Sequence, residues 1–225
     1  MKFLVISDIH GETEMIEKLD PCFKKADGVI FAGDFAKYEH EETGLPVLQL
    51  LCKKHETIFA VIGNCDNPDF ISELESRDVC VQKTLVMHDG IAFCGSGGGS
   101  KFTGTTPNER EDSELLSDFN IITSEGKQEW NNLIAIMHNP PKDTECDKVA
   151  PAVHVGSPLL RTFIDDYKPL AVVTGHIHES FAVCKCGDTT VVNPGSLAEG
   201  KYAWLEVEKS TGGKWEVKSC TLESL

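Results

Sequence analysis

The chain has 225 residues, of which 40% are hydrophobic, and a formal net charge of −15. This length and apolar content fit one domain over residues 1–225 with a sizeable core. The acidic balance, without a cluster of Lys and Arg, argues against a scaffold for duplex nucleic acid, and no stretch predicts a membrane span. The nine cysteines are irregularly spaced and no signal peptide precedes the first apolar run. We therefore expect reduced thiols and a cytoplasmic location.

The first half of the chain alternates between strand and helix patterns. Apolar runs over 2–7, 29–32 and 58–62 read as strands, and apolar residues at helical spacing over 15–19 and 47–51 predict the helices between them. Repeats of this kind predict right-handed crossovers and a parallel sheet. The expected fold class is therefore α/β.

The middle of the chain changes character. Residues 80–86 and 91–94 predict the two strands of a β-hairpin, with Asp89 and Gly90 at its turn. The acidic segment from Glu109 to Asp118 predicts a surface helix or a lid.

A glycine-rich run over 95–101 lies between these two features. It fails the phosphate-loop pattern, because Ser100 stands where a glycine is required before Lys101. We expect a flexible loop beside the functional site instead.

The second half resumes with a strand over 133–137. Ser157 as N-cap and Pro158 in the first turn predict a helix that runs to about Tyr167. The chain shows neither internal repeats nor a linker-like shift in composition. Five further apolar segments predict the remaining strands, at 170–174, 181–184, 189–192, 202–207 and 215–219.

Short polar clusters follow the strands. Asp, Asn and His are the ligand types of a hydrolytic divalent-metal site, and open α/β folds gather such groups at the carboxyl edge of the sheet. Glycines before three of these residues are expected to let the backbone turn sharply. The polar groups are Asp8 and His10, Gly33 and Asp34, Gly63 to Asp66, His138, and Gly175 to His178.

Two of the clusters have ligand types two positions apart. Asp8 and His10, and likewise His176 and His178, share one side if the backbone is extended. Each pair would then reach one ion. The other cysteine and histidine patterns, such as the Cys184 to Cys186 run, lack metal-site spacing and are expected to be packing or surface residues.

This ordered set resembles the calcineurin-like metallophosphoesterase superfamily, whose pattern is D-x-H, G-D, G-N-H-[DE], H and G-H-x-H. The resemblance spans residues 8 to 178, and Asn193 to Ser196 extends it toward the small bacterial and archaeal phosphodiesterase branch. It implies a four-layer α/β/β/α sandwich with two facing sheets. It also implies two divalent metal ions, the first held by Asp8, His10 and His178, the second by Asn64, His138 and His176, with Asp34 bridging them.

The resemblance further implies a phosphohydrolase in which a metal-bridging hydroxide attacks phosphorus. The mixed oxygen and nitrogen ligands suit manganese, iron or zinc. Asp34, Asn64, Cys65 and Asp66 are the candidate catalytic residues, and the substrate would be a small-molecule phosphate ester.

The sequence departs from the family pattern at Cys65, where a His usually lies near the phosphate. A thiol is a poor substitute for an imidazolium, so Cys65 is either a catalytic or a buried structural residue. Residues 35–38 contain no Arg of the kind that follows the bridging Asp in protein phosphatases, and this favours diesters. His154, before the helix start, is a candidate substrate-binding residue together with Asn64.

The leading prediction is a dinuclear phosphodiesterase. Two alternatives stay open: a non-catalytic metal-binding scaffold on the same fold, and a phosphomonoesterase or nucleotide pyrophosphatase. A homo-oligomer is also left open.

Overall fold

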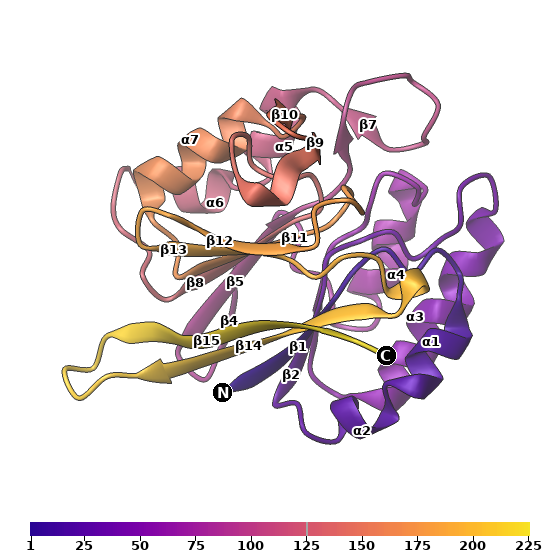
Figure 1. Ribbon diagram of the computed structural model, residues 1–225, viewed down its shortest axis with the longest axis horizontal. Helices are drawn as coiled ribbons and strands as arrows, with labels where there is room; N and C mark the ends of the chain where they lie inside the picture. Colours follow the sequence, from indigo (N-terminus) through magenta and orange to yellow (C-terminus); the bar gives the residue numbers. More distant parts are fainter. Residues whose placement is uncertain (125) are drawn as a thin grey trace.

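The computed structural model describes residues 1–124 and 126–225, and two mixed β-sheets form its centre (Figure 1). The first sheet has the order β15-β14-β1-β2-β3, in which β1, β2 and β3 are parallel and the C-terminal hairpin joins antiparallel to β1. Its strands are β1 (Lys2–Ile6), β2 (Gly28–Phe31), β3 (Ile58–Ala60), β14 (Lys201–Lys209) and β15 (Trp215–Ser224).

The second sheet has the order β12-β13-β11-β8-β5-β4. Its four inner strands are parallel, and β12 and β4 pair antiparallel at the two edges. Its strands are β4 (Val86–His88), β5 (Ile91–Ser96), β8 (Leu133–Met137), β11 (Ala171–Thr174), β12 (Ala182–Cys186) and β13 (Thr189–Asn193).

Helices cover the outer face of each sheet (Figure 1). The first sheet carries α1 (Thr13–Lys18), α2 (Asp20–Phe23), α3 (Gly44–Lys54) and α4 (Ile71–Glu75), and the second carries α5 (Asp112–Ser117), α6 (Asn120–Thr123) and α7 (Pro158–Tyr167). The shorter elements are β6 (Gly99–Ser100), β7 (Glu109–Arg110), β9 (Lys148–Ala150), β10 (Val153–His154), and 3₁₀ turns at Glu41–Thr43, Pro68–Phe70, Glu145–Asp147 and Leu197–Glu199.

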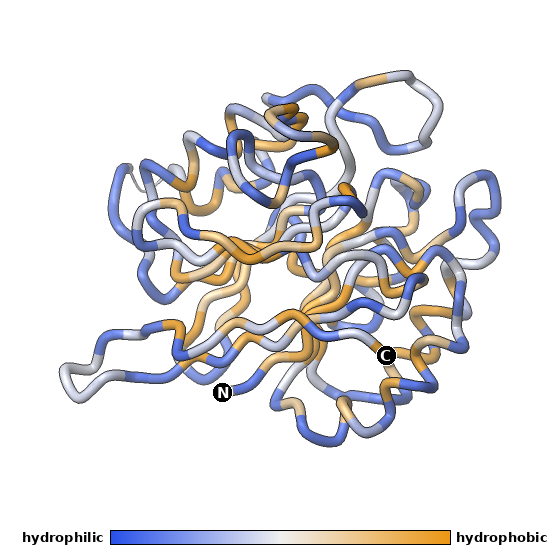
Figure 2. The backbone as a smooth tube through the Cα atoms, in the orientation of Figure 1, coloured by the Kyte–Doolittle hydropathy of each residue, from blue (hydrophilic) through white to orange (hydrophobic). Residues whose placement is uncertain are grey.

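Three separate hydrophobic cores hold these layers together. One lies between the two sheets, and the other two lie between each sheet and its helices. Along β1, Phe3 and Val5 face the inner core while Leu4 and Ile6 face the helices. Because such strands are buried on both faces, they are apolar without alternation, which Figure 2 shows as continuous hydrophobic strands through the centre. The four-layer α/β/β/α architecture is thereby confirmed.

The strand prediction over 80–86 is wrong. The hairpin partner of β5 is β4, which begins at Val86, whereas Cys80 and Gln82 make isolated parallel bridges to Ala60 and Gly95. This segment crosses between the two sheets and has one bridge to each. The turn at Asp89 and Gly90 is confirmed, with both residues at positive φ.

The expectation of a flexible glycine-rich loop also fails. Gly95 to Gly99 are buried, and a Cβ at Gly97 would lie 2.2 Å from Oε1 of Gln82. The run therefore packs tightly against its neighbours and continues β5 into β6. The acidic segment forms a helix, α5, whose Leu115 is buried beneath it.

The described part of the chain contains no helix that is long and apolar enough to cross a membrane.

Candidate metal centre

The loops that follow five parallel strands meet at one edge of the two sheets. Because the carboxyl ends of β1, β2 and β3 and those of β8 and β11 lie at this edge, side chains from both sheets converge there. Nε2 of His138, which follows β8, lies 3.5 Å from Oδ1 of Asp34, which follows β2. All seven sequence-predicted metal ligands belong to this cluster.

Asp8, His10 and His178 form one half of the cluster. Nε2 of His178 lies 3.3 Å from Oδ1 of Asp8 and 3.2 Å from Nε2 of His10. Potential ligand atoms of these three residues all lie within 4.8 Å of one another. Two imidazole nitrogens that face each other beside a buried carboxylate are an arrangement that a cation satisfies.

Asn64, His138 and His176 form the other half. Nδ1 of His138 donates to the carbonyl of Ala32 at 2.6 Å, which leaves Nε2 unprotonated. That Nε2 lies 2.8 Å from Oδ1 of Asn64, so two acceptors face each other. The ring of His176 lies beside that of His138, with centroids 5.3 Å apart.

Asp34 lies between the two halves. Its Oδ2 is 3.8 Å from Nε2 of His10 and its Oδ1 is 3.5 Å from Nε2 of His138. Asp8 and Asp34 are both almost completely buried, and neither carboxylate pairs with Lys or Arg in the described residues. The donor set therefore fits divalent cations, which would compensate two buried negative charges.

Burial also prepares two of the histidines for metal binding. It lowers the pKa of His176 to about 4 and lowers that of His138 as well. Both rings are therefore neutral near pH 7, which is the form that binds a metal. Burial and the neighbouring Asp8 raise the pKa of Asp34, an unfavourable interaction that bound cations would relieve.

Four of the clustered residues have left-handed backbone conformations. Asp8, His10, Asp34 and His176 have φ values of +53°, +47°, +62° and +67°. The expectation that the Asp8 and His10 pair shares one side of an extended segment is therefore wrong, although the two side chains do meet. Such conformations are uncommon outside glycine, cost of order 1 kcal/mol or more, and concentrate at functional sites.

The glycines before Asn64 and His176 serve close approach rather than a sharp turn. A Cβ at Gly63 would lie 1.9 Å from Oδ1 of Asp34, and one at Gly175 would lie 2.1 Å from Oγ of Ser7. Neither glycine has a positive φ. Any side chain at these positions would displace the loops that carry Asp34 and Asp8.

Asp66 organises the cluster from behind. Its buried carboxylate accepts hydrogen bonds from the backbone N–H groups of Gly63, Asp34, Phe35 and Ala36. It therefore ties the loop after β3 to the loop after β2. These contacts favour a positioning role for Asp66.

The loop after β13 makes hydrogen bonds to the loops after β1 and β11. Nδ2 of Asn193 donates to the carbonyls of Gly175 and Ile177, and Oγ of Ser196 donates to the carbonyl of Asp8. The Asn193 to Ser196 motif thus joins the loop after β1 in the first sheet to the loop after β11 in the second.

Cys65 lies inside the cluster. Its backbone N–H donates to Oδ1 of Asp34 at 2.8 Å, and its thiol approaches His10 and Asp34 within 4.8 Å. Burial and the Asp34 carboxylate raise the pKa of the Cys65 thiol, which keeps it protonated. The position that is usually His in the family therefore holds a neutral thiol beside the ligands.

The structure gives no support to His154 as a substrate-binding residue. Nδ1 of His154 lies 2.6 Å from the buried Asp147 carboxylate, and the cavity beside the cluster is lined by other residues. The α7 N-terminus is also not free for an anion, because Ser157 accepts from the N–H of Leu160 and Asp112 accepts from that of Leu159.

Sequence analysis named Asn64, His176 and the glycine-rich run, which line part of this cavity, but it missed the apolar residues of the lining. They include Phe102, Val149 and Val155, which are exposed although they are apolar. Phe102 is an isolated aromatic residue in a polar segment rich in Thr, and this was the signal in the sequence that could have indicated the cavity lining.

The comparisons with known proteins agree with this geometry. Residues 1–180 match the family model described as calcineurin-like phosphoesterase, and the chain belongs to this family. An uncharacterized protein of Methanocaldococcus jannaschii is 32% identical over 205 residues, which cover 86% of this chain and 88% of the relative.

Two solved structures share the fold at low identity. A dimetal phosphatase from Danio rerio has a TM-score of 0.65 and 10% identity, covering 100% of this chain and 98% of that one. A structure described as a novel archaeal phosphodiesterase has a TM-score of 0.52 and 17% identity, covering 100% of both chains.

Proposed function

We propose that this protein is a dinuclear metal-dependent phosphohydrolase that acts on phosphodiesters. The observation that carries the proposal is the convergence of seven Asp, Asn and His side chains from five strand ends. Among them, Nε2 of His138 and Oδ1 of Asn64 are two acceptor atoms that face each other. Asp8, His10 and His178 would hold one ion, and Asn64, His138 and His176 the other, with Asp34 shared. Bound divalent ions would activate water near neutral pH and neutralise charge on phosphoryl oxygens.

The chain's own residues supply orientation and access. Asn64 and His176 border the cavity beside the cluster, so a phosphate ester would enter from that side. The side chains of His10 and His178 are 20% and 36% exposed and His176 is partly exposed, whereas the other four proposed ligands are buried. Hydrolysis would add water to phosphorus, break one P–O bond and release an alcohol and a monoester.

Two features favour diesters over monoesters. In residues 35–38 no Arg follows the bridging Asp, and a dianionic monoester profits more from such a cation than a monoanionic diester does. The cavity lining offers one basic side chain, Lys101, which pairs with Glu111 at 2.6 Å. The metals proposed are manganese, iron or zinc, and the whole chain acts as one domain.

The test is hydrolysis of bis-p-nitrophenyl phosphate during titration of metal-free protein with Mn²⁺, Fe²⁺ or Zn²⁺. We expect activity to rise with metal content and level off near two ions per chain. Binding of two ions without hydrolysis of mono- or diesters would instead identify a metal-binding scaffold. Faster turnover of p-nitrophenyl phosphate than of the diester would identify a monoesterase.

A further inference from the structure

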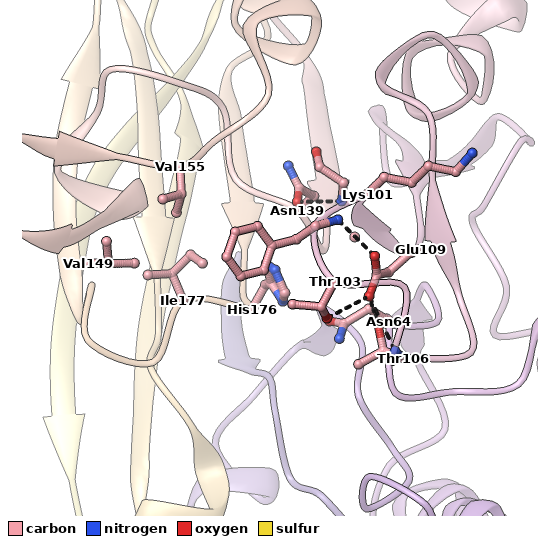
Figure 3. Close-up of a pocket in the computed structure, with 13 residues that line it drawn as sticks. Asn64, Lys101, Thr103, Thr106, Glu109, Asn139, Val149, Val155, His176 and Ile177 are labelled. Atoms are coloured by element: carbon pink, nitrogen blue, oxygen red, sulfur yellow. Dashed lines mark hydrogen bonds between the residues drawn. The ribbon is translucent and has the colours of Figure 1, made fainter.

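A cavity of about 330 Å³ opens beside the proposed metal centre (Figure 3). Asn64 and His176 belong both to its lining and to the ligand cluster. Gly99, at the start of β6, packs against both residues, since a Cβ there would lie 3.1 Å from Cβ of Asn64 and 3.5 Å from Cε1 of His176. A group attached to a phosphate at the metal centre would therefore extend into this cavity.

One side of the cavity is apolar. Val149, Val155 and Ile177 lie together on that side in Figure 3, opposite Asn64 and Glu109. They come from β9, from the segment after β10 and from the loop after β11. Val149 and Val155 expose apolar surface, and Ile177 is buried behind it, so the apolar side of the cavity is built from three chain segments rather than from scattered surface residues.

Phe102 adds an aromatic wall to the lining. Its side chain is 93% exposed, the most exposed of the large hydrophobic residues. Val149 and Val155 are 39% and 42% exposed. Leaving such surface in water is unfavourable by about 25 cal/mol per Å², so an apolar occupant would gain affinity by covering it.

The polar groups of the lining are already paired within the chain. Oδ1 of Asn139 accepts from the N–H of Ser100 at 2.9 Å, and Nζ of Lys101 pairs with Glu111. The carboxylate of Glu109 accepts from four backbone N–H groups between Phe102 and Thr106. Few hydrogen-bonding groups therefore remain for a polar occupant.

The same contacts fix the backbone of the loop that carries Phe102 before any ligand binds. The Glu109 carboxylate accepts from backbone N–H groups of the segment over 102–106, so this loop is held without substrate. A loop whose backbone is already in place reduces the ordering cost of binding.

We propose that this cavity is a subsite for an apolar ester group of the substrate, with Phe102 as its principal contact. The proposal rests on the proposed phosphodiesterase function and adds the substrate class: phosphodiesters that carry one aromatic or alkyl group beside the leaving group. The volume sits at the low end of small-molecule sites, which suits a single ring or a short chain.

The test uses Mn²⁺-loaded protein and three p-nitrophenyl phosphodiesters whose second ester group is methyl, butyl or phenyl. Because the leaving group is constant, kcat/KM reports contacts of the second group. We expect the larger esters to exceed the methyl ester on the order of 10-fold. A higher kcat/KM for the phenyl ester than for the butyl ester would identify stacking on Phe102. Equal kcat/KM for the phenyl and butyl esters, both above the methyl ester, would identify an alkyl-chain subsite.

Variants test the assignment to the cavity. Phe102→Ala and Val155→Asn should each reduce the preference over methyl several-fold. Met87→Ala is the matched control, since Met87 is a 57% exposed apolar residue on β4 outside the cavity. An unchanged preference in both cavity variants would overturn the proposal.

A binding measurement separates this proposal from the proposed function. Calorimetry compares phenylphosphonate with methylphosphonate on the same protein, and Phe102→Ala should weaken only the former. If no ester is hydrolysed but phenylphosphonate binds through Phe102, the subsite stands and the phosphodiesterase assignment falls. If the methyl ester is hydrolysed and the ring gives no advantage in either assay, the subsite falls alone. A dimer that dissociates in Phe102→Ala would show that a second copy covers the cavity, and this too would overturn it.

Discussion

Asp34 lies between the two halves of the candidate metal cluster. Each of its carboxylate oxygens faces a different half, toward His10 and toward His138. We expect Asp34→Asn to lower kcat at least 10³-fold and to reduce the metal content below two ions per chain, because one negative charge is lost at both positions. Elemental analysis and diester hydrolysis measure this. Asp188→Asn, on an exposed turn, is the control, and wild-type turnover with two ions bound in Asp34→Asn would refute the bridging role.

Cys65 is the residue at which the chain departs from its family. Its thiol lies beside His10 and Asp34, and a His there would place an imidazole near the leaving group. We expect Cys65→His to fold and to increase kcat/KM more for alkyl leaving groups than for p-nitrophenolate, which scarcely needs a proton. Substrates of graded leaving-group pKa measure the effect. Equal changes across the series, at constant metal content, would mean that position 65 does not handle this proton.

Asp66 joins two loops through its carboxylate. It accepts from four buried backbone N–H groups, and an amide cannot accept as strongly as a carboxylate. We expect Asp66→Asn to destabilise the fold by about 1–3 kcal/mol and to weaken metal binding without abolishing it. Urea unfolding and metal titration would check this. Asp69→Asn, on the exposed surface, should do neither.

At the scale of elements, the loop between β6 and β7 depends on one carboxylate. Hydrogen bonds from the N–H groups of Phe102 to Thr106 lower the pKa of Glu109 to about 2. Since the folded pKa lies below the ordinary value of 4.5, the stabilisation is fully present above pH 4.5 and is lost as the pH falls toward 2. We expect the protection of the amides over 102–106, measured as the exchange rate relative to the intrinsic rate at the same pH, to fall across this range. Glu109→Gln should show low protection already at pH 7, and protection equal to wild type there would contradict this role of Glu109.

At the scale of the whole molecule, the metal centre lies outside the cores that hold the fold. Three hydrophobic clusters pack the sheets and helices, and the proposed ligands lie on loops at one edge. We expect removal of metal by EDTA to abolish hydrolysis and leave the far-ultraviolet circular dichroism largely unchanged. Global unfolding on chelation would show that the ions also organise the core, as they do in zinc fingers.

The order of polar clusters after apolar strands was enough to predict the convergence of the candidate ligands and to identify the family, and the resemblance to that family implied the four layers. This worked because side chains at the carboxyl ends of parallel strands share one edge of a sheet wherever the intervening helices lie. Hydrophobic patterning likewise identified the principal strands, since the central strands bury apolar residues on both faces.

The features that depend on contacts between distant segments appeared only in the tertiary structure. They are the left-handed backbone at Asp8 and His176, the hydrogen bonds from four N–H groups to Asp66, and the pairing of His154 with Asp147. Local sequence patterns do not predict them. The packed glycine-rich run and the cavity beside it also depend on contacts between distant segments. Phe102 lines that cavity because β6 pairs with β7 and because Glu109 holds the loop between them, and both interactions depend on how the chain folds back on itself.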